Sequence, residues 1–411
     1  NLATALPDIE AESARFALDP VPFRNPGLLR YGANRNLILL ASAGRTVAMA
    51  DDDLFPEFRT RPDADGGLAL LPGSDPSLFR AFIREADVEG YGVESTSSAF
   101  KAHGVLGKRV ADLIGDAEFV ACGGIDAASL DRALDPDARI AAISFGVWGD
   151  SGMGNSRFLL GARERLDPES FAQATYADLA ASRTLFRAPR RLSLGGIFFM
   201  GDHVSFDLTQ LLPPFSPLGR CEDSLWAACL ARIRPDLLVA NPREAVRHAP
   251  LGKRVTERRE VLGFVVRCNE VLAALLPHPD AAGSAAETFR VVGASLCAVG
   301  AAPLPKFRRW VSERYGHHLS LLIERMEALR SAFGGEAEDW DEDMRIATDD
   351  LRELAARPLC WLPEEFADDE EGFRLYLLRF GLLLEAWPAL MERAEQVAEE
   401  LLEGARVRSK A

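Results

Sequence analysis

The spacing of apolar residues in this chain of 411 residues changes near residue 255. Before that point, short apolar runs alternate with turns in which Gly and Pro recur, which is typical of strands mixed with helices. After it, apolar residues recur at three- and four-residue spacing over long stretches, which predicts amphipathic helices. The sequence therefore predicts an α/β domain over residues 1–254, followed by an all-α domain over residues 255–411.

The apolar runs also predict where the elements lie. Strands are expected over residues 37–40, 46–50, 140–145, 195–200 and 237–240. The first run is ambiguous, because residues 34–43 could equally form a helix that leads into the second run. Helices are expected over residues 255–276, 285–299, 306–333, 344–356 and 372–402, with Pro and Gly between them. The acidic stretches 336–343 and 364–371 are expected to be solvated loops or helix starts.

Composition excludes several classes of protein. The net charge of −15 argues against a nucleic-acid-binding surface, which needs a basic face, and short basic stretches such as 187–191 are expected to be solvated loop charges. No run approaches the roughly 20 apolar residues of a membrane span, so none is expected. The six cysteines include no Cys-x-x-Cys pair, which excludes a zinc ribbon and favours a reducing, cytoplasmic compartment.

Residues 32–36, with the sequence Gly-Ala-Asn-Arg-Asn, precede an apolar helical stretch. Gly lets a backbone approach a ligand, and Asn34, Arg35 and Asn36 offer donors to a phosphate or ribose. The alternative interpretation is a helix cap, with Asn34 capping a helix that ends at Gly44.

Three consecutive carboxylates, Asp51, Asp52 and Asp53, directly follow the apolar run 47–50. Alternate residues of an extended segment point the same way, so Asp51 and Asp53 are expected on one side. Hard cations such as Mg²⁺ and Mn²⁺ favour carboxylate oxygens and leave positions for phosphate oxygens. The pattern predicts a divalent-cation site at a sheet edge, and a solvated acidic turn is the alternative.

Two further elements lie much later in the sequence. Glu222 and Asp223 open an amphipathic stretch, either because carboxylates favour a helix N-terminus or because one of them is a general base that faces an acceptor hydroxyl. His248 follows the run 237–240, and it can be a third metal ligand only if folding brings it to the triplet.

Taken in order, these four elements resemble the glycosyltransferases of the GT-A fold, in particular family 2, and the last part is similar to bacterial galactofuranosyltransferases. The resemblance covers about residues 28–250 and rests on the order of the motifs. It implies a GT-A-like mixed sheet flanked by helices. It also implies that Asp51, Asp53 and His248 hold Mn²⁺ or Mg²⁺ on the donor pyrophosphate.

The remaining roles follow from the same resemblance. Asp223 would be the base, and Glu222 would position the acceptor or the base. The donor nucleotide would contact residues of the first two elements, namely Asn34, Arg35, Asn36, Asp51 and Asp52. Asp150 and Asp202 lie in Gly-rich turns between the motifs, where they either bond their own backbone or line an acceptor site.

The function implied is metal-dependent transfer of a sugar, with inversion, from a nucleotide donor linked to uridine diphosphate (UDP) to a hydroxyl of an unidentified acceptor. One alternative is a nucleotidyltransferase, although that class needs a Gly-rich basic loop near its start, which is not visible in this sequence. The other is a non-catalytic interaction protein with a remnant GT-A domain, and the helical part offers a surface for a homo-oligomer. Only fifty residues precede the triplet and the chain starts at Asn1, so we expect upstream residues to complete the nucleotide pocket.

Overall fold

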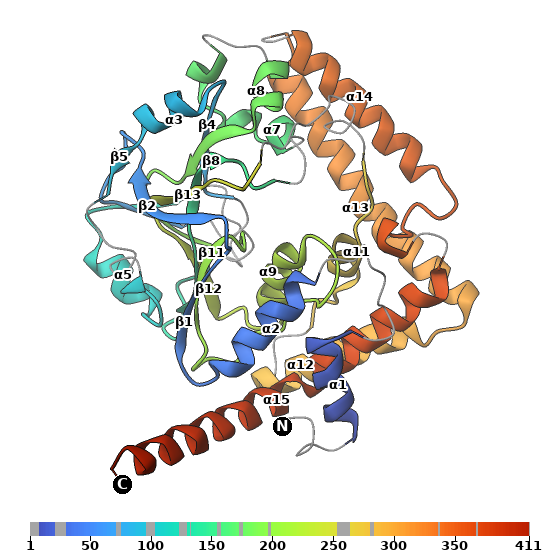
Figure 1. Cartoon of the computed structure of the whole chain (residues 1–411). Coiled ribbons are helices and arrows are strands. Elements are labelled where there is room, and N and C mark those ends of the chain that lie inside the picture. The colour runs from blue at the N-terminus through green and yellow to red at the C-terminus, as the bar shows by residue number, and fades with distance from the viewer. Residues whose placement is uncertain are drawn as a thin grey trace.

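The computed structural model describes residues 8–20, 30–70, 75–95, 103–122, 130–131, 133–153, 158–171, 176–195, 199–252, 264–279, 283–335, 338–366 and 369–410. These residues form two mixed β-sheets surrounded by helices and a helical C-terminal region, so the predicted fold class is confirmed (Figure 1). The predicted domain boundary at residues 254 and 255 lies outside the described residues.

The first sheet has seven strands. Their order across the sheet is β1 (Thr46–Ala50), β11 (His203–Asp207), β7 (Arg139–Ser144), β12 (Leu237–Asn241), β10 (Leu192–Gly195), β3 (Leu68–Leu70) and β6 (Val120–Cys122). Helix α5 (Val110–Asp116) covers one face, where Val110 and Leu113 pack against strand residues such as Ile140. Helices α2 (Tyr31–Ala41) and α9 (Glu222–Ile233) lie on the opposite side of the sheet from α5 (Figure 1).

The second sheet has six strands. Their order is β4 (Leu78–Phe82), β9 (Thr184–Ala188), β8 (Gly146–Asp150), β13 (Glu244–His248), β2 (Leu54–Thr60) and β5 (Val93–Glu94). Helix α3 (Glu85–Tyr91) packs Val88 against Trp148 and Phe186 on one face. The short helices near the other face are α7 (Phe158–Gly161), α8 (Tyr176–Ser182), η2 (Arg163–Arg165) and η3 (Pro168–Phe171).

The chain passes from the first sheet to the second three times over short breaks. Strand β1 continues into β2, β7 into β8, and β12 into β13. The three breaks are residues 51–53, residue 145 and residues 242–243. Because the triplet Asp51 to Asp53 occupies the first break, its carboxylates lie where the two sheets meet.

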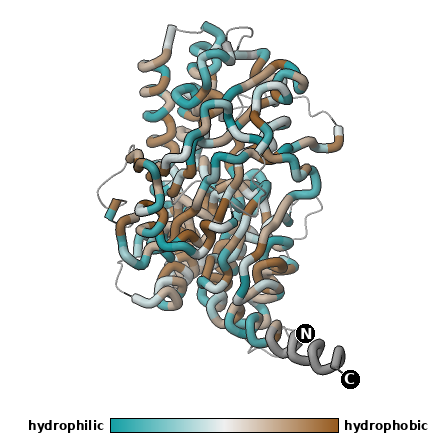
Figure 2. The backbone as a smooth tube through the Cα atoms, turned by 90° about the vertical axis from the view of Figure 1, so that its left-hand side faces the viewer, coloured by the Kyte–Doolittle hydropathy of each residue, from teal (hydrophilic) through white to brown (hydrophobic). Residues whose placement is uncertain are grey.

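The C-terminal region is built from helices, and Figure 2 shows hydrophobic and hydrophilic residues interspersed along the backbone of the molecule. The helices are α11 (Cys268–Leu275), α12 (Ala285–Gly300), α13 (Leu304–Phe333), α14 (Glu338–Ala355), η4 (Glu364–Phe366) and α15 (Glu370–Lys410). Helix α15 runs beside α12 and α1 (Asp8–Leu18), and its C-terminal end projects from the body (Figure 1). Within the described residues, no helix combines the length and apolarity needed to cross a membrane.

Helix α15 also anchors the segment between β11 and α9. Trp387 donates its indole N–H to the carbonyl of Leu212 at 2.8 Å. The hydroxyl of Tyr376 lies 2.6 Å from Ser216 Oγ and accepts the N–H of Leu218 at 3.1 Å. One apolar core therefore runs from the sheets into the C-terminal helices.

Most of the predicted elements are confirmed. Strands are present at 46–50, 139–144 and 237–241, and four long helices follow residue 284. The segment 37–40 is helical, which is the alternative interpretation, because Leu39 and Leu40 belong to the buried face of α2 while Leu37 is exposed. Of the strand expected over 195–200, Gly195 belongs to β10, residues 196–198 lie outside the described residues, and residues 199–200 are in no strand, so the expectation is wrong for those last two. The helix expected over 255–276 is described only from residue 264, and it begins at Cys268.

Tyr376→Phe tests the contact between α15 and the segment before α9. The change removes the acceptor of the buried Leu218 N–H, and we expect a loss of about 1–3 kcal/mol in the free energy of unfolding. Urea unfolding measures it. Tyr31→Phe is the control, because this tyrosine is exposed and should change stability by less than about 0.5 kcal/mol. Equal effects of the two changes would contradict the role given to Tyr376.

Candidate functional site

The pairing of strand β13 with its neighbours brings His248 to the acidic triplet. In the antiparallel ladder of β13 and β2, His248 lies opposite Leu54, the residue directly after Asp53. The N–H of Ala249 donates to the carbonyl of Asp53 at 3.0 Å, which fixes this register next to the break between the sheets. As a result, His248 Nε2 lies 3.1 Å from Asp53 Oδ2, and the imidazole is buried.

The two nitrogens of His248 face different partners. Nδ1 lies 2.9 Å from the carbonyl oxygen of Asp150, and since a carbonyl only accepts, Nδ1 must carry the proton of this hydrogen bond. Nε2 then faces the Asp53 carboxylate either with a second proton or with its lone pair toward a cation. A backbone hydrogen bond of this kind is what orients a histidine that binds metal through its other nitrogen.

The distance between Nε2 and Oδ2 suits two ligands of one cation. Neighbouring ligands of an octahedral ion lie about 3.0 Å apart when each bond is about 2.1 Å long. The 3.1 Å separation of His248 and Asp53 matches this spacing. Among the described residues, however, no set of three His, Cys, Asp or Glu side chains already stands in a metal-binding arrangement. The ligand roles of Asp51, Asp53 and His248 therefore stay a prediction.

A further carboxylate, Asp202, lies directly before strand β11 and borders the triplet. Ala50 pairs with His203, and the N–H of Asp51 donates to the carbonyl of Asp202 at 2.9 Å. Asp202 Oδ2 is buried and has no hydrogen-bond partner among the described residues. Burial raises the pKa of Asp202, against the opposing effect of Arg187. An orphaned buried carboxylate oxygen beside Asp51 is a feature that a bound cation would satisfy.

Asp51 lies between positive and negative neighbours. Partial burial of this half-exposed side chain raises its pKa to about 6, Arg35 opposes this effect, and the nearby carboxylates Asp202 and Asp53 add to it. The guanidinium of Arg35 approaches Asp51 Oδ1 at 3.6 Å and donates to the carbonyl of Gly201 at 3.1 Å. The site thus holds more negative charge than its arginines offset, which favours either proton uptake or a divalent cation.

The acidic pair at the start of α9 reaches the same region. Glu222 is buried in an ion pair with Arg35, and Asp223 Oδ2 accepts the N–H of Gly201 at 3.3 Å. Cys221, which precedes the pair, has a φ of 63° in the left-handed region, an uncommon conformation that recurs at functional sites. Half-buried Asp223 is therefore the more accessible of the two carboxylates, and Glu222 is the more constrained.

The residues expected to bind the nucleotide divide into two groups. Arg35 lies among the carboxylates, where it pairs with Asp51 and Glu222, and Asp52 is exposed in the turn beside them. The prediction that Asn36 contacts the nucleotide is wrong, because its amide is buried. It donates to the carbonyls of Ala17 and Phe215 and accepts the N–H of Phe215, so it holds α2 in place and does not face a ligand. The capping alternative for Asn34 is also wrong, since α2 begins at Tyr31 and Asn34 is exposed in its first turn.

Two residues near the site were not assigned these roles from the sequence. Asp150 pairs with Arg183 at 3.0 Å and holds His248 through its carbonyl. Arg187 was expected in a solvated loop, but this prediction is wrong, because Arg187 lies buried on β9 directly after the apolar residues Leu185 and Phe186, which are the signal that could have indicated a buried strand.

Comparisons with models of protein families, with curated proteins and with solved structures find no match for this chain. The assignment of a function therefore rests on the geometry described above and on the order of the motifs.

Glu222→Gln tests the electrostatics of the site. Burial raises the pKa of Glu222 to about 7, with Asp223 adding to the effect and Arg35 opposing it. The folded protein holds the proton of Glu222 more tightly than the unfolded chain does. The stability that the protonated carboxyl contributes is therefore present at low pH and is lost as the pH rises through about 7. We expect Glu222→Gln to gain stability relative to the unchanged protein between about pH 5 and about pH 8, as measured by urea unfolding.

Glu371→Gln is the matched control for this measurement. Glu371 also pairs with an arginine, Arg374 at 2.6 Å, but it is exposed on α15. Its stability difference should be the same at both ends of the pH range. A gain of the same size in both variants would contradict the proposed effect of burial at Glu222.

Proposed function

We propose that this protein is a metal-dependent glycosyltransferase that moves a sugar from a UDP-linked donor to a hydroxyl of an acceptor. The observation that carries the proposal is the approach of His248 Nε2 to Asp53 Oδ2 at 3.1 Å. The two residues are distant in sequence, and the motif order that resembles family 2 of the GT-A fold requires them to meet. Their convergence supports that resemblance over a solvated acidic turn.

Asp51, Asp53 and His248 would hold the Mn²⁺ or Mg²⁺ ion in this proposal. Their oxygen and imidazole donors fit such an ion, and the orphaned oxygen of Asp202 supports a need for positive charge at this point. Mg²⁺ sites commonly use few carboxylates and complete their shell with substrate phosphates, which suits a pair of preformed ligands. When bound, the ion offsets the charge that develops on the departing nucleoside diphosphate.

Asp223 is the proposed general base. Its Oδ2 is oriented by the N–H of Gly201, and its position beside the buried pair of Glu222 and Arg35 limits its movement. The carboxylate takes the proton of the acceptor hydroxyl as that oxygen attacks the anomeric carbon, and the reaction inverts the configuration. Glu222 is a positioning residue, since its contact is with Arg35.

A cytoplasmic location belongs to the same proposal. The six cysteines are all free thiols in the structure, which supports a reducing compartment.

The first test is calorimetry with UDP and Mn²⁺. We expect UDP to bind only when Mn²⁺ is present, and we expect Asp51→Asn and His248→Gln each to weaken this binding at least about 10-fold, because each removes a group that holds the ion. Asp51→Asn is not expected to unfold the protein, since the pKa of Asp51 is raised and the change removes an unfavourable charge.

Asp63→Asn is the matched control for Asp51→Asn. Both aspartates pair with an arginine, and their side chains are 45% and 47% exposed, but Asp63 lies in a different turn. Its substitution should leave UDP binding unchanged. Metal-independent binding of UDP, or an equal effect of the two changes, would rule out the metal site.

The second test separates chemistry from donor binding. Asp223→Asn should lower the release of UDP from a panel of UDP-sugars by about 10²–10⁴-fold, because it removes the base, while Mn²⁺-dependent UDP binding stays unchanged. Both quantities are measured on the same preparation.

Asp112→Asn controls for a simple helix-end effect. Asp112 lies in the first turn of α5, as Asp223 does in the first turn of α9. Its substitution should leave UDP release intact. If Asp223→Asn also leaves the release of UDP intact, the assignment of the base is wrong.

A further inference from the structure

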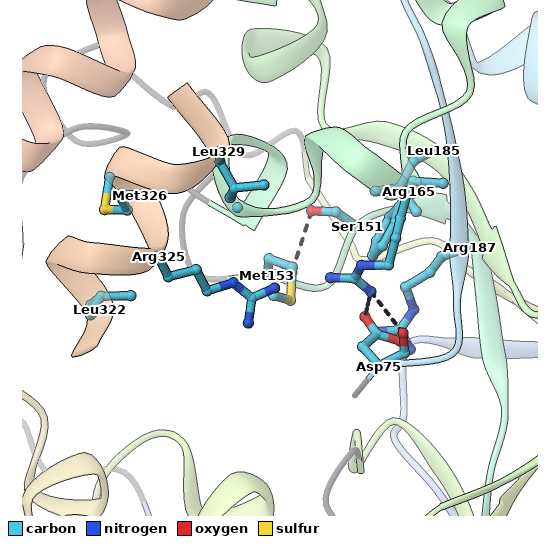
Figure 3. A pocket seen from close by; sticks show the side chains of 12 residues that line it. Asp75, Ser151, Met153, Arg165, Leu185, Arg187, Leu322, Arg325, Met326 and Leu329 are labelled. Carbon is cyan, nitrogen blue, oxygen red and sulfur yellow. Dashed lines mark hydrogen bonds and ion pairs between the residues drawn. The ribbon is translucent and has the colours of Figure 1, made fainter. Parts of the chain in front are cut away.

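A cavity of about 360 Å³ lies between helix α13 and the second sheet. One wall is apolar and consists of Leu322, Met326 and Leu329 of α13 (Figure 3). The opposite wall carries Arg165 and Arg187, close to Asp75. Arg325 reaches from α13 toward Met153 and Arg165, so guanidinium groups approach the cavity from both sides (Figure 3).

The charges of this cavity are predominantly positive. Its described lining includes three arginines and one carboxylate, Asp75, which forms an ion pair with Arg165. Arg187 is buried, so its guanidinium lies away from bulk water, and this burial lowers its pKa. Arg325 approaches Glu164 at 3.6 Å and is more than half exposed. A group with a negative charge is therefore the complementary occupant.

The cavity lies next to the residues that position His248. Ser151 and Met153 of its lining directly follow Asp150, whose carbonyl holds His248. Between them, Gly152 has a φ of 68°, and a Cβ at this position would lie 3.5 Å from His248 Cε1 and 3.6 Å from Asp202 Oδ2. The carboxylates that act on the pKa of Arg187 also come from both places, namely Asp75, Asp202 and Asp223. Residues 151–153 thus lie next to both the cavity and the carboxylates around His248.

We propose that this cavity binds the acceptor and that the acceptor carries an acidic group, a phosphate or a carboxylate, next to an apolar part. The inference rests on the proposed glycosyl transfer. Arginine binds oxyanions through two parallel hydrogen bonds, and the α13 wall covers apolar surface. The lining at Ser151 directly follows Asp150, which holds His248, so an acceptor bound here has its hydroxyl near the proposed site of transfer, and the volume suits a ligand the size of a sugar.

Calorimetry without metal or donor tests the inference. The probes are glucose 1-phosphate, glucuronate and methyl glucoside, which share a sugar ring and differ in charge. We expect the better of the two acids to bind at least about 10-fold more tightly than the neutral glycoside, and its identity tells whether the acidic group is a phosphate or a carboxylate. Equal affinity for the neutral probe would overturn the proposal, as would no binding of either acid.

Arg325→Gln and Arg309→Gln form a matched pair for the same titration. Both arginines lie on α13 and pair with a glutamate, with 59% and 77% of their side chains exposed, but only Arg325 lines the cavity. Arg325→Gln should weaken binding of the acid about 10-fold and leave Mn²⁺-dependent UDP binding unchanged, whereas Arg309→Gln should alter neither. An equal effect of the two changes on acid binding would overturn the proposal.

The two proposals fail in different ways. If UDP binds with Mn²⁺ but the acid does not bind, the transferase proposal stands and the acceptor site is wrong. If the acid binds and UDP does not, the acceptor role is overturned together with glycosyl transfer, and the cavity is an anion site of another kind.

Discussion

The pairing of β13 with β2 and β8 is the constraint on which the site depends. Strand register has a period of two residues, so a shift of one residue would turn His248 to the other face of the sheet and away from Asp53. The ladder with β8 sets His248 opposite Gly149, next to the carbonyl of Asp150 that orients the imidazole. The same two pairings therefore fix both the place of the ring and its protonated nitrogen.

The electrostatics of the site favours the uptake of positive charge. Carboxylates directly after β1, directly before β11 and at the start of α9 converge on a region where Arg35 and Arg187 offset only part of the charge. Burial raises the pKa of each of Asp51, Asp202 and Glu222, so the folded protein holds these groups at a cost that a proton or a cation relieves. A solvated acidic turn carries no such cost, because water screens its charges.

The sequence predicted the parts of the fold that depend on local periodicity. The long helices after residue 284 and the strands at 46–50 and 237–241 follow from apolar spacing alone. The division of the strands into two sheets did not, because it depends on pairing between distant segments. For the same reason the sequence could pair Asp53 with His248 only through a resemblance, and it misjudged Asn36 and Arg187, whose polar side chains are buried by long-range packing.

The C-terminal helices contribute to the site and are not a separate attachment. Tyr376 and Trp387 of α15 bond the segment 212–218, and Asn269 of α11 donates to the carbonyls of Leu218 and Arg220. These contacts hold the backbone directly before Cys221 in place, and the left-handed φ of Cys221 needs such support. They therefore orient Glu222 and Asp223. Since α13 also forms one wall of the cavity, a change in the packing of these helices would reach the base and the proposed acceptor site together.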